Sequence, residues 1–257
     1  MTPILAFDIE TVPDVEGLRR VWGLGPEVSD SAVVELASQR RRQATGSDFL
    51  PHYLQRVVAV SCVLRAGDGV RVWSLGEPDE PEQALVQRFF DGIEKYTPQL
   101  VSWNGGGFDL PVLHYRALFH GIAGCCYWDV GDGNRDFRYN NYLGRFHTRH
   151  IDLMDLLAGY QNRAWAPLSE IAQMCGLPGK LGMDGSRVHE AWRRGAIGAI
   201  RDYCETDVAN TYLLYLRFQL IRGLLDPPGY EREVGLFRAF LAAQGAAHWK
   251  EFAAAWK

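Results

Sequence analysis

The sequence predicts an α/β protein, in which a mixed β-sheet is flanked by α-helices. Three observations support this class. Short apolar stretches alternate with longer stretches of helical periodicity along the chain. The segment RAGDG joins two apolar stretches and indicates a β-hairpin. The later strands are separated by helices, and this order is typical of a sheet covered by helices.

The expected strands are rich in Val, Ile and Leu and are bounded by residues that favour turns. The first strand is ILAFDIET, and RVVAVSCVL and VRVWSL form the two strands of the hairpin. The next strand, QLVSWN, is followed by a run of glycines. HIDLMDLL begins as a strand and leads into a helix. Strands are therefore expected at 4–11, 56–64, 70–75, 99–104 and 150–157.

The expected helices carry signals at their ends. Residues 81–96 place acids early and Lys95 late, which suits the helix dipole. In residues 109–121, Pro111 falls in the first turn and Gly121 at the end. Helices are expected at 81–96, 109–121, 166–179, 186–195, 196–223 and 231–244, the last after a Pro-Pro-Gly break at 227–229.

Two segments are interpreted as insertions, residues 14–50 and residues 128–148. The basic run Arg40, Arg41 and Arg42 in the first is expected on a solvated helix face. We predict a single domain over residues 1–257, with a core at about 3–220 and a C-terminal helical extension at 229–257.

The composition is that of a globular protein with a sizeable core. The chain has 257 residues, of which 47% are hydrophobic and 23% charged. It contains no apolar run long enough to span a membrane. Five scattered cysteines without a C-x-x-C pair predict a reduced, cytoplasmic protein without a disulfide framework or structural zinc. The net charge of −4 does not indicate a nucleic-acid binder, but two divalent ions would neutralise it.

Asp8 and Glu10 are separated by one residue in a predicted strand. Side chains alternate along a strand, so the two carboxylates share one face while Ile9 points to the other. Like charges this close repel and shift each other's pKa. Either both side chains face water on an edge strand, or a cation binds between them.

Three further candidates lie at the ends or on the faces of predicted helices. Asp109 stands where a strand ends and a helix begins, where it is either an N-cap or a ligand. Tyr203 and Asp207 are four residues apart and share one face of a long helix. Taken singly, Tyr203 and Asp207 are also compatible with ordinary solvated positions.

The segments FDIET, WNGGGFD and YCETD occur in the order and context of the three motifs of the DEDD superfamily of 3′–5′ exonucleases. Because Tyr203 precedes Asp207 by four residues, the chain resembles the tyrosine branch of that superfamily. More closely, it resembles the predicted bacterial exonucleases related to the exonuclease domain of family B DNA polymerases. The resemblance covers roughly residues 3–220.

The resemblance implies a ribonuclease-H-like fold and two divalent metal ions. The four carboxylates of Asp8, Glu10, Asp109 and Asp207 would hold them, and Mg²⁺ or Mn²⁺ favours such oxygen ligands. Tyr203 would orient the attacking water. Since the pKa of a free tyrosine is near 10, positioning is expected more than proton removal.

The resemblance also implies contacts to the substrate. Thr11 would bond the terminal 3′-hydroxyl, and the loop of Asn104 and its three glycines would lie beside the terminal nucleotide. Phe108 would either stack on a base or pack under the sheet. Two basic residues, Arg145 and Lys180, are either phosphate contacts or parts of structured loops. Lys180 lies in a glycine-rich loop. Arg145 lies in a stretch where arginines alternate with aromatic residues, namely Arg138, Tyr139, Tyr142, Phe146 and Arg149.

Four polar residues are given structural roles. Asp152 and Asp155 are expected to support the site or cap a helix, because the set of four acids is already complete. His147 and His150 lack further zinc ligands and are expected to be structural.

We therefore expect a metal-dependent 3′–5′ exonuclease that hydrolyses phosphodiester bonds at single-stranded 3′ ends and releases nucleoside 5′-monophosphates. The expected partner is the 3′ end of single-stranded nucleic acid, DNA rather than RNA, and no membrane. Two alternatives stay open: a 3′–5′ exoribonuclease, since the motifs do not read the 2′-hydroxyl, and a non-catalytic nucleic-acid-binding module of the same fold.

Overall fold

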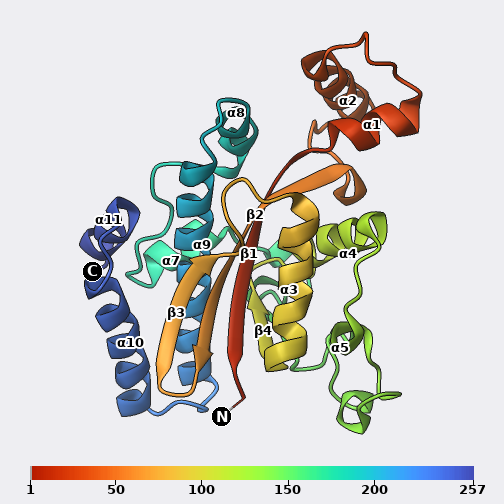
Figure 1. Ribbon diagram of the computed structural model, residues 1–257. Coiled ribbons are helices and arrows are strands. Elements are labelled where there is room, and N and C mark those ends of the chain that lie inside the picture. Colours follow the sequence, from red (N-terminus) through yellow and green to blue (C-terminus); the bar gives the residue numbers. More distant parts are fainter. Residues whose placement is uncertain (1) are drawn as a thin grey trace.

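The computed structural model describes residues 2–257 and contains one mixed sheet of five strands in the order β3-β2-β1-β4-β5 (Figure 1). β1 pairs with β2 and β2 with β3 in antiparallel fashion, whereas β4 runs parallel to both β1 and β5. The strands span Ile4–Pro13 (β1), Gln55–Ala66 (β2), Gly69–Ser74 (β3), Gln99–Ser102 (β4) and His150–Asp152 (β5). All five predicted strands are confirmed, and the α/β class with them.

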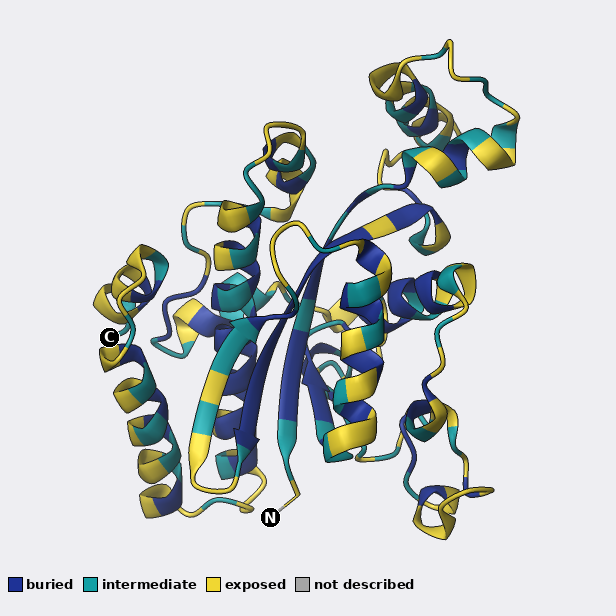
Figure 2. Cartoon of the chain, in the orientation of Figure 1, coloured by how far each residue is buried: buried dark blue, intermediate teal, exposed yellow. Residues whose placement is uncertain are grey.

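Helices cover both faces of the sheet, and Figure 2 shows that the central strands are buried while the outer sides of the helices are exposed. One face packs against α3 and α4 around Phe7, Phe89 and Leu113. The other packs against α9 and its neighbours around Ala6, Val101 and Tyr212. The helices of the first face are α3 (Glu82–Tyr96), α4 (Asp109–His120) and α5 (Cys125–Trp128), and those of the second face are α7 (Leu168–Met174), α9 (Ile197–Ile221), α10 (Pro227–Ala242) and α11 (Ala247–Ala255).

The segment after β1 forms a small helical unit that projects beyond the sheet (Figure 1). Its helices α1 (Val15–Trp22) and α2 (Asp30–Thr45) enclose a separate small core that includes Leu18 and Val33. The arginines of α2 lie on its outer side, as predicted: Arg40 stacks on Trp22 and Arg42 pairs with Asp48. The chain returns to β2 through a 3₁₀ turn, η1 (His52–Leu54).

The C-terminal helices differ from the prediction. Pro227 and Pro228 do not precede the helix but form its first turn, where a missing N–H costs nothing. Asp226 caps this turn by accepting a hydrogen bond from the N–H of Gly229 (2.8 Å). The predicted helical extension at 229–257 consists of two helices, and the second, α11, buries Trp249 and Phe252 against the second face.

The remaining helical segments are short. The predicted helix at 166–179 is confirmed only for α7, and that at 186–195 consists of the turn η4 and the helix α8. No helix within residues 2–257 is both long enough and apolar enough to cross a membrane. The short segments are α6 (Leu153–Leu157), α8 (Val188–Arg193), η2 (Arg135–Arg138), η3 (Asn162–Ala164) and η4 (Gly185–Arg187).

A buried charge cluster ties the end of β1 to α3 and α4. The guanidinium of Arg116 bonds the carboxylates of Asp14 (2.6 Å) and Glu82 (2.7 Å from Nε). Glu82 also accepts from the backbone N–H of Val57 (2.7 Å) and contacts His120 (2.9 Å). All the charges of this Arg116 cluster therefore have a partner.

Candidate active site

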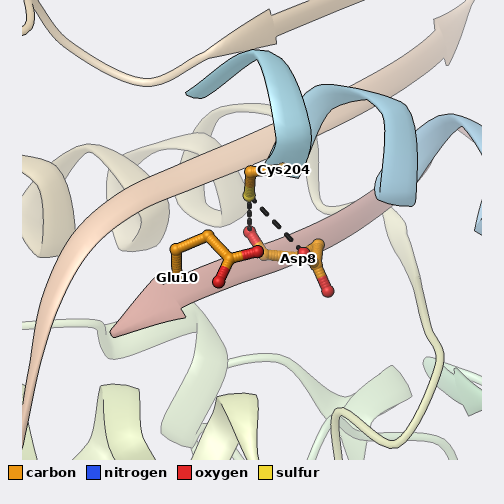
Figure 3. Close-up of side chains that lie close together, drawn as sticks. All are labelled: Asp8, Glu10 and Cys204. Carbon is orange, nitrogen blue, oxygen red and sulfur yellow. Dashed lines mark hydrogen bonds between the residues drawn. The ribbon is translucent and has the colours of Figure 1, made fainter. Parts of the chain in front are cut away.

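β1 places Asp8 and Glu10 on the face of the sheet that α9 covers. Ile9, between them, is buried in the opposite core, as the strand alternation predicts. Figure 3 shows both carboxylates below α9, where the thiol of Cys204 lies 3.4 Å from the carbonyl oxygen of Asp8 and 3.5 Å from its carboxylate. The pair therefore does not stand on an exposed edge strand, since β1 is the central strand of the sheet.

Asp109 reaches β1 because β4 ends early. β4 pairs with β1 only as far as Ala6, so the backbone N–H of Ile9 has no strand partner on that side. The carboxylate of Asp109 accepts this N–H at 3.0 Å. The residue before α4 is Phe108, and its side chain makes no capping bond. The N-cap alternative for Asp109 is therefore wrong: its carboxylate faces the strand that carries the other two acids.

α9 supplies the last two predicted residues. Tyr203 and Asp207 are one helical turn apart, and the charge of Asp207 contributes to the raised pKa of Tyr203. Tyr203 is 7% exposed and packs with Val12 of β1. Both side chains thus point from the helix toward the sheet rather than into solvent.

The carboxylates of Asp8 and Glu10 lie within 4.8 Å of each other, and the charges of Asp109 and Asp207 act on both. Burial raises the pKa of Asp8 well above its usual range, and the charges of Asp109, Glu10 and Asp207 raise it further. Burial also raises the pKa of Glu10, with Asp207 and Asp109 adding to the shift. The pKa of Asp109 is raised to about 7 and that of Asp207 to about 6, in both cases chiefly by burial.

Lys180 is the cation that lies near this acidic cluster. Its positive charge favours the ionised carboxylates of Glu10 and Asp207. It therefore lowers the pKa of both residues and partly offsets the effect of burial. Its ammonium is 5.9 Å from the centre of the Tyr203 ring. The acids outnumber this lysine, and such a donor set suits hard divalent cations, which bind carboxylate oxygens. The residues present therefore fit the metal ions that the sequence predicts.

Cys204 is the residue that sequence reasoning missed. Its sulfur and the carboxylates of Asp8 and Glu10 lie within 4.8 Å of one another. Burial raises the pKa of this thiol well above its usual range, so it acts as a hydrogen-bond donor to Asp8 and not as a thiolate. The signal was its spacing, because Ile200, Cys204 and Asp207 follow the period of one helix face.

Two of the predicted substrate contacts, Thr11 and Phe108, adjoin a carboxylate residue along the chain, and Asn104 opens the loop that leads to Asp109. The hydroxyl of Thr11 donates to Gln55 (3.2 Å) just after a register shift between Glu10 and Thr11. Asn104 adopts a left-handed conformation (φ 66°), and its N–H donates to Asp152. Phe108 packs on the core of the α3–α4 face, and its ring centre lies 5.6 Å from that of Phe49.

Gly105 is required where it stands in the loop that precedes Asp109. A Cβ atom at Gly105 would lie 2.5 Å from the Cβ atom of Ser102, which cannot rotate away. Only glycine therefore lets the loop turn this tightly into the first turn of α4.

The Arg/Tyr-rich stretch near residue 145 is largely engaged in its own structure. Arg145 makes two 3.0 Å hydrogen bonds to Asp155, although it borders a cavity of about 460 Å³ together with Asn104. The hydroxyl of Tyr142 is buried and donates to Pro98 (2.6 Å). Arg149 stacks on the rings of Phe137 and Tyr142. For Tyr142 and Arg149 the prediction of a nucleic-acid contact is wrong, and the structured-loop alternative holds.

The structural roles of the remaining polar residues are confirmed. Asp152 caps α6 by accepting from the N–H of Asp155 (3.3 Å), and it also binds the N–H groups of Asn104 and Gly106 (2.9 Å each). His147 accepts from Asn141 and His150 contacts Ser102 (2.7 Å).

A five-stranded mixed sheet with helices on both faces, and acidic residues gathered beside its central strand, defines a ribonuclease-H-like α/β protein. Residues 47–256 match the family described as predicted 3′–5′ exonucleases related to the exonuclease domain of PolB, and the chain belongs to this family. It is therefore an enzyme of the 3′–5′ exonuclease class, which acts on nucleic acid and generally depends on divalent metal. The match begins after β1, which carries Asp8 and Glu10, and includes α10 and α11.

Relatives among characterised proteins are similar over about half of the chain. The catalytic polypeptide of DNA polymerase epsilon is 26% identical over 149 residues in Kluyveromyces lactis and over 146 residues in Emericella nidulans. The protein of the same name from Dictyostelium discoideum is 26% identical over 147 residues. These stretches cover 54–55% of the chain but only 6% of each relative.

Proposed function

We propose that this exonuclease removes nucleotides from single-stranded 3′ ends, preferentially of DNA, and releases nucleoside 5′-monophosphates. The observation that carries the proposal is the set of four buried or partly buried carboxylates from β1, α4 and α9 whose charges act on one another, opposed by Lys180. The names of the polymerase relatives support DNA as the substrate.

Asp8, Glu10, Asp109 and Asp207 would hold two divalent ions, Mg²⁺ or Mn²⁺. Such ions lower the pKa of a bound water and stabilise the negative charge that develops on the leaving oxygen. The protein contributes the position of the ligands: Asp109 is fixed by the N–H of Ile9, and Asp8 by the thiol of Cys204.

Tyr203 would position the attacking water and keep its own proton. Burial and the nearby carboxylates raise the pKa of Tyr203, so its hydroxyl is a poor base at neutral pH. Its position one turn of α9 before Asp207 places the hydroxyl beside the proposed metal ligands. Lys180, close to the Tyr203 ring, would pair with a phosphate of the substrate.

The residues beside the carboxylates would hold the terminal nucleotide. Thr11 and Asn104 are the nearest polar candidates along the chain, and Phe108 offers the part of its ring that the core leaves uncovered. Arg145 is proposed only as a more distant phosphate contact, because Asp155 already neutralises it.

We also propose that residues 1–257 form a single domain, because α10 and α11 share one hydrophobic core with α9 and the sheet. A cytoplasmic location is supported by the cysteines: all five are free thiols.

The decisive experiment is digestion of end-labelled single-stranded DNA, matched RNA and a duplex with a mismatched 3′ end, in parallel and with Mg²⁺. We expect stepwise loss of 3′ nucleotides from DNA, none in EDTA, and none with the Asp207→Ala variant. Preferential digestion of RNA would establish the exoribonuclease instead. Binding of all substrates without cleavage would establish a non-catalytic module, while cleavage in EDTA would exclude a metal-dependent reaction.

Tyr203→Phe separates positioning from a structural role. Loss of the hydroxyl should lower kcat about tenfold or more while KM changes little, since the ring and its packing stay in place. An equal loss in kcat and in substrate binding would assign Tyr203 to the architecture of the site.

A further inference from the structure

A group of aromatic side chains lies exposed beside the first turns of α4. Phe49 is 56% exposed, Tyr53 51% and Tyr115 46%. The rings of Phe49 and His52 each lie 5.6 Å from the ring of Phe108, and those of Tyr53 and Tyr115 lie 6.0 Å apart. We call Phe49, His52, Tyr53 and Tyr115 the aromatic platform.

Two links along the chain connect the platform to the acidic cluster. Phe108, which the platform contacts, immediately precedes Asp109. Gln55, two residues after Tyr53, accepts a hydrogen bond from the hydroxyl of Thr11, the residue after Glu10. Tyr115 lies about 10 Å further along α4 than Phe108, so the platform leads away from the carboxylates.

Positive charge borders the platform without an acidic partner. Arg41 donates to the carbonyl oxygen of Phe49 (3.1 Å) and forms no ion pair within residues 2–257. Its neighbour Arg42, by contrast, is paired with Asp48 (2.7 Å). Exposed rings with an unpaired arginine beside them suit a single strand, whose bases stack and whose phosphates need cations.

We propose that the aromatic platform binds the nucleotides of a single-stranded substrate that lie 5′ of the terminal nucleotide. This inference rests on the proposed function. A 3′ end held at the carboxylates can continue only in the 5′ direction, and the platform is longer than a single base. Stacking on aromatic faces tolerates any sequence, which an exonuclease that proceeds along a strand requires.

The test compares two double variants in EDTA, so that binding is measured without cleavage. The probe is a short oligothymidylate with a 5′-fluorescein label, followed by fluorescence anisotropy. Tyr53→Ala with Tyr115→Ala should weaken binding about tenfold or more. The matched control, Trp128→Ala with Met174→Ala, removes two apolar side chains that are 44% and 82% exposed on α5 and α7 and should change the affinity less than about twofold.

A second experiment removes bases from the probe to test whether the platform binds by stacking. Replacing the second to fourth nucleotides from the 3′ end by abasic sites should weaken binding of the wild-type protein, but weaken binding of the platform variant much less. Tyr53→Phe with Tyr115→Phe keeps the rings and should retain both the affinity and the abasic effect. An abasic effect of equal size in the wild type and the platform variant would overturn the proposal.

The outcomes separate this inference from the proposed function. Wild-type protein that binds as described but does not cleave with Mg²⁺ would contradict only the proposed function. Cleavage by the wild type, together with unchanged binding in the platform variant, would contradict only the platform. Failure of the wild type to bind the probe in EDTA, or an equal loss of affinity in the control variant, would also overturn the platform.

Discussion

Two buried charge clusters lie along the same strand, and they are built in opposite ways. In the Arg116 cluster, a guanidinium lies between the carboxylates of Asp14 and Glu82 and joins the end of β1 to α3 and α4. In the acidic cluster, Asp8 and Glu10 of the same strand face two further acids, with Lys180 nearby.

The difference separates a structural cluster from a functional one. Around Arg116, burial opposes the charge, but Glu82 and Asp14 more than compensate and the pKa of Arg116 is raised. In the acidic cluster burial and like charges act in the same direction, and the pKa of each carboxyl is raised. Buried charges that are paired stabilise a fold once formed, whereas unpaired acids create affinity for a cation.

The largest effect is expected on activity. Asp8→Asn should lower kcat/KM on the order of 10³-fold, because a ligand of the proposed metal site loses its charge. Glu82→Gln changes the same functional group in the Arg116 cluster and should leave the activity of the folded protein nearly unchanged. Nuclease assays on both purified variants check this contrast, and strong inactivation by Glu82→Gln would break it.

The Arg116 cluster should dominate stability instead. Arg116→Met leaves Asp14 and Glu82 buried without their partner, which should lower the free energy of unfolding by about 3–5 kcal/mol. The exposed pair of Arg145 and Asp155 supplies the control, since Arg145→Met should cost less than about 1 kcal/mol. Urea denaturation measures both; similar losses in the two variants would contradict the distinction.

Divalent cations should stabilise the protein through the acidic cluster alone. At a free Mn²⁺ concentration about 100 times Kd, binding to the folded state adds about 2.7 kcal/mol. Thermal unfolding should show this gain in the wild type and in Glu82→Gln, but not in a variant carrying Asp8→Asn and Asp207→Asn. A gain that survives in that double variant would place the metal elsewhere.

The metal-free protein should lose stability as the pH rises from about 4 to 7. The pKa of Asp109 (about 7) and of Asp207 (about 6) lie above their unfolded values, so the folded state binds more protons in this range. The contribution is fully present below pH 4 and is lost as the pH rises through the folded-state values. Urea midpoints measured after EDTA dialysis should show it, with a flatter profile in Asp207→Asn.

Much of the fold follows from local sequence patterns, and the deviations have physical causes. Strand alternation and turn signals located the five strands because their apolar runs are short and clearly bounded. The bounds of α11 within the predicted extension were not located, because it has nine residues and packing of Trp249 and Phe252 stabilises it more than its own periodicity. The break expected at 227–229 became a helix start because Asp226 caps it.

For the candidate site, too, one part follows from local sequence and another part depends on the overall fold. Local geometry alone places Asp8 with Glu10 on a strand face and Tyr203 with Asp207 on a helix face. That these two pairs meet depends on long-range topology, which only the resemblance to a known family supplied. The roles of Tyr142 and Arg149 were not predictable, because a sequence of alternating arginine and aromatic residues looks the same whether its rings face solvent or one another.

The hydrogen bond from Ile9 to Asp109 has a consequence for mutational tolerance. Its donor is a backbone N–H, which every amino acid except proline supplies. The side chain at position 9 can therefore vary with the demands of the core beneath it, while the orientation of the Asp109 carboxylate stays the same. Sequences can drift at the centre of the FDIET segment without disturbing the acids on either side.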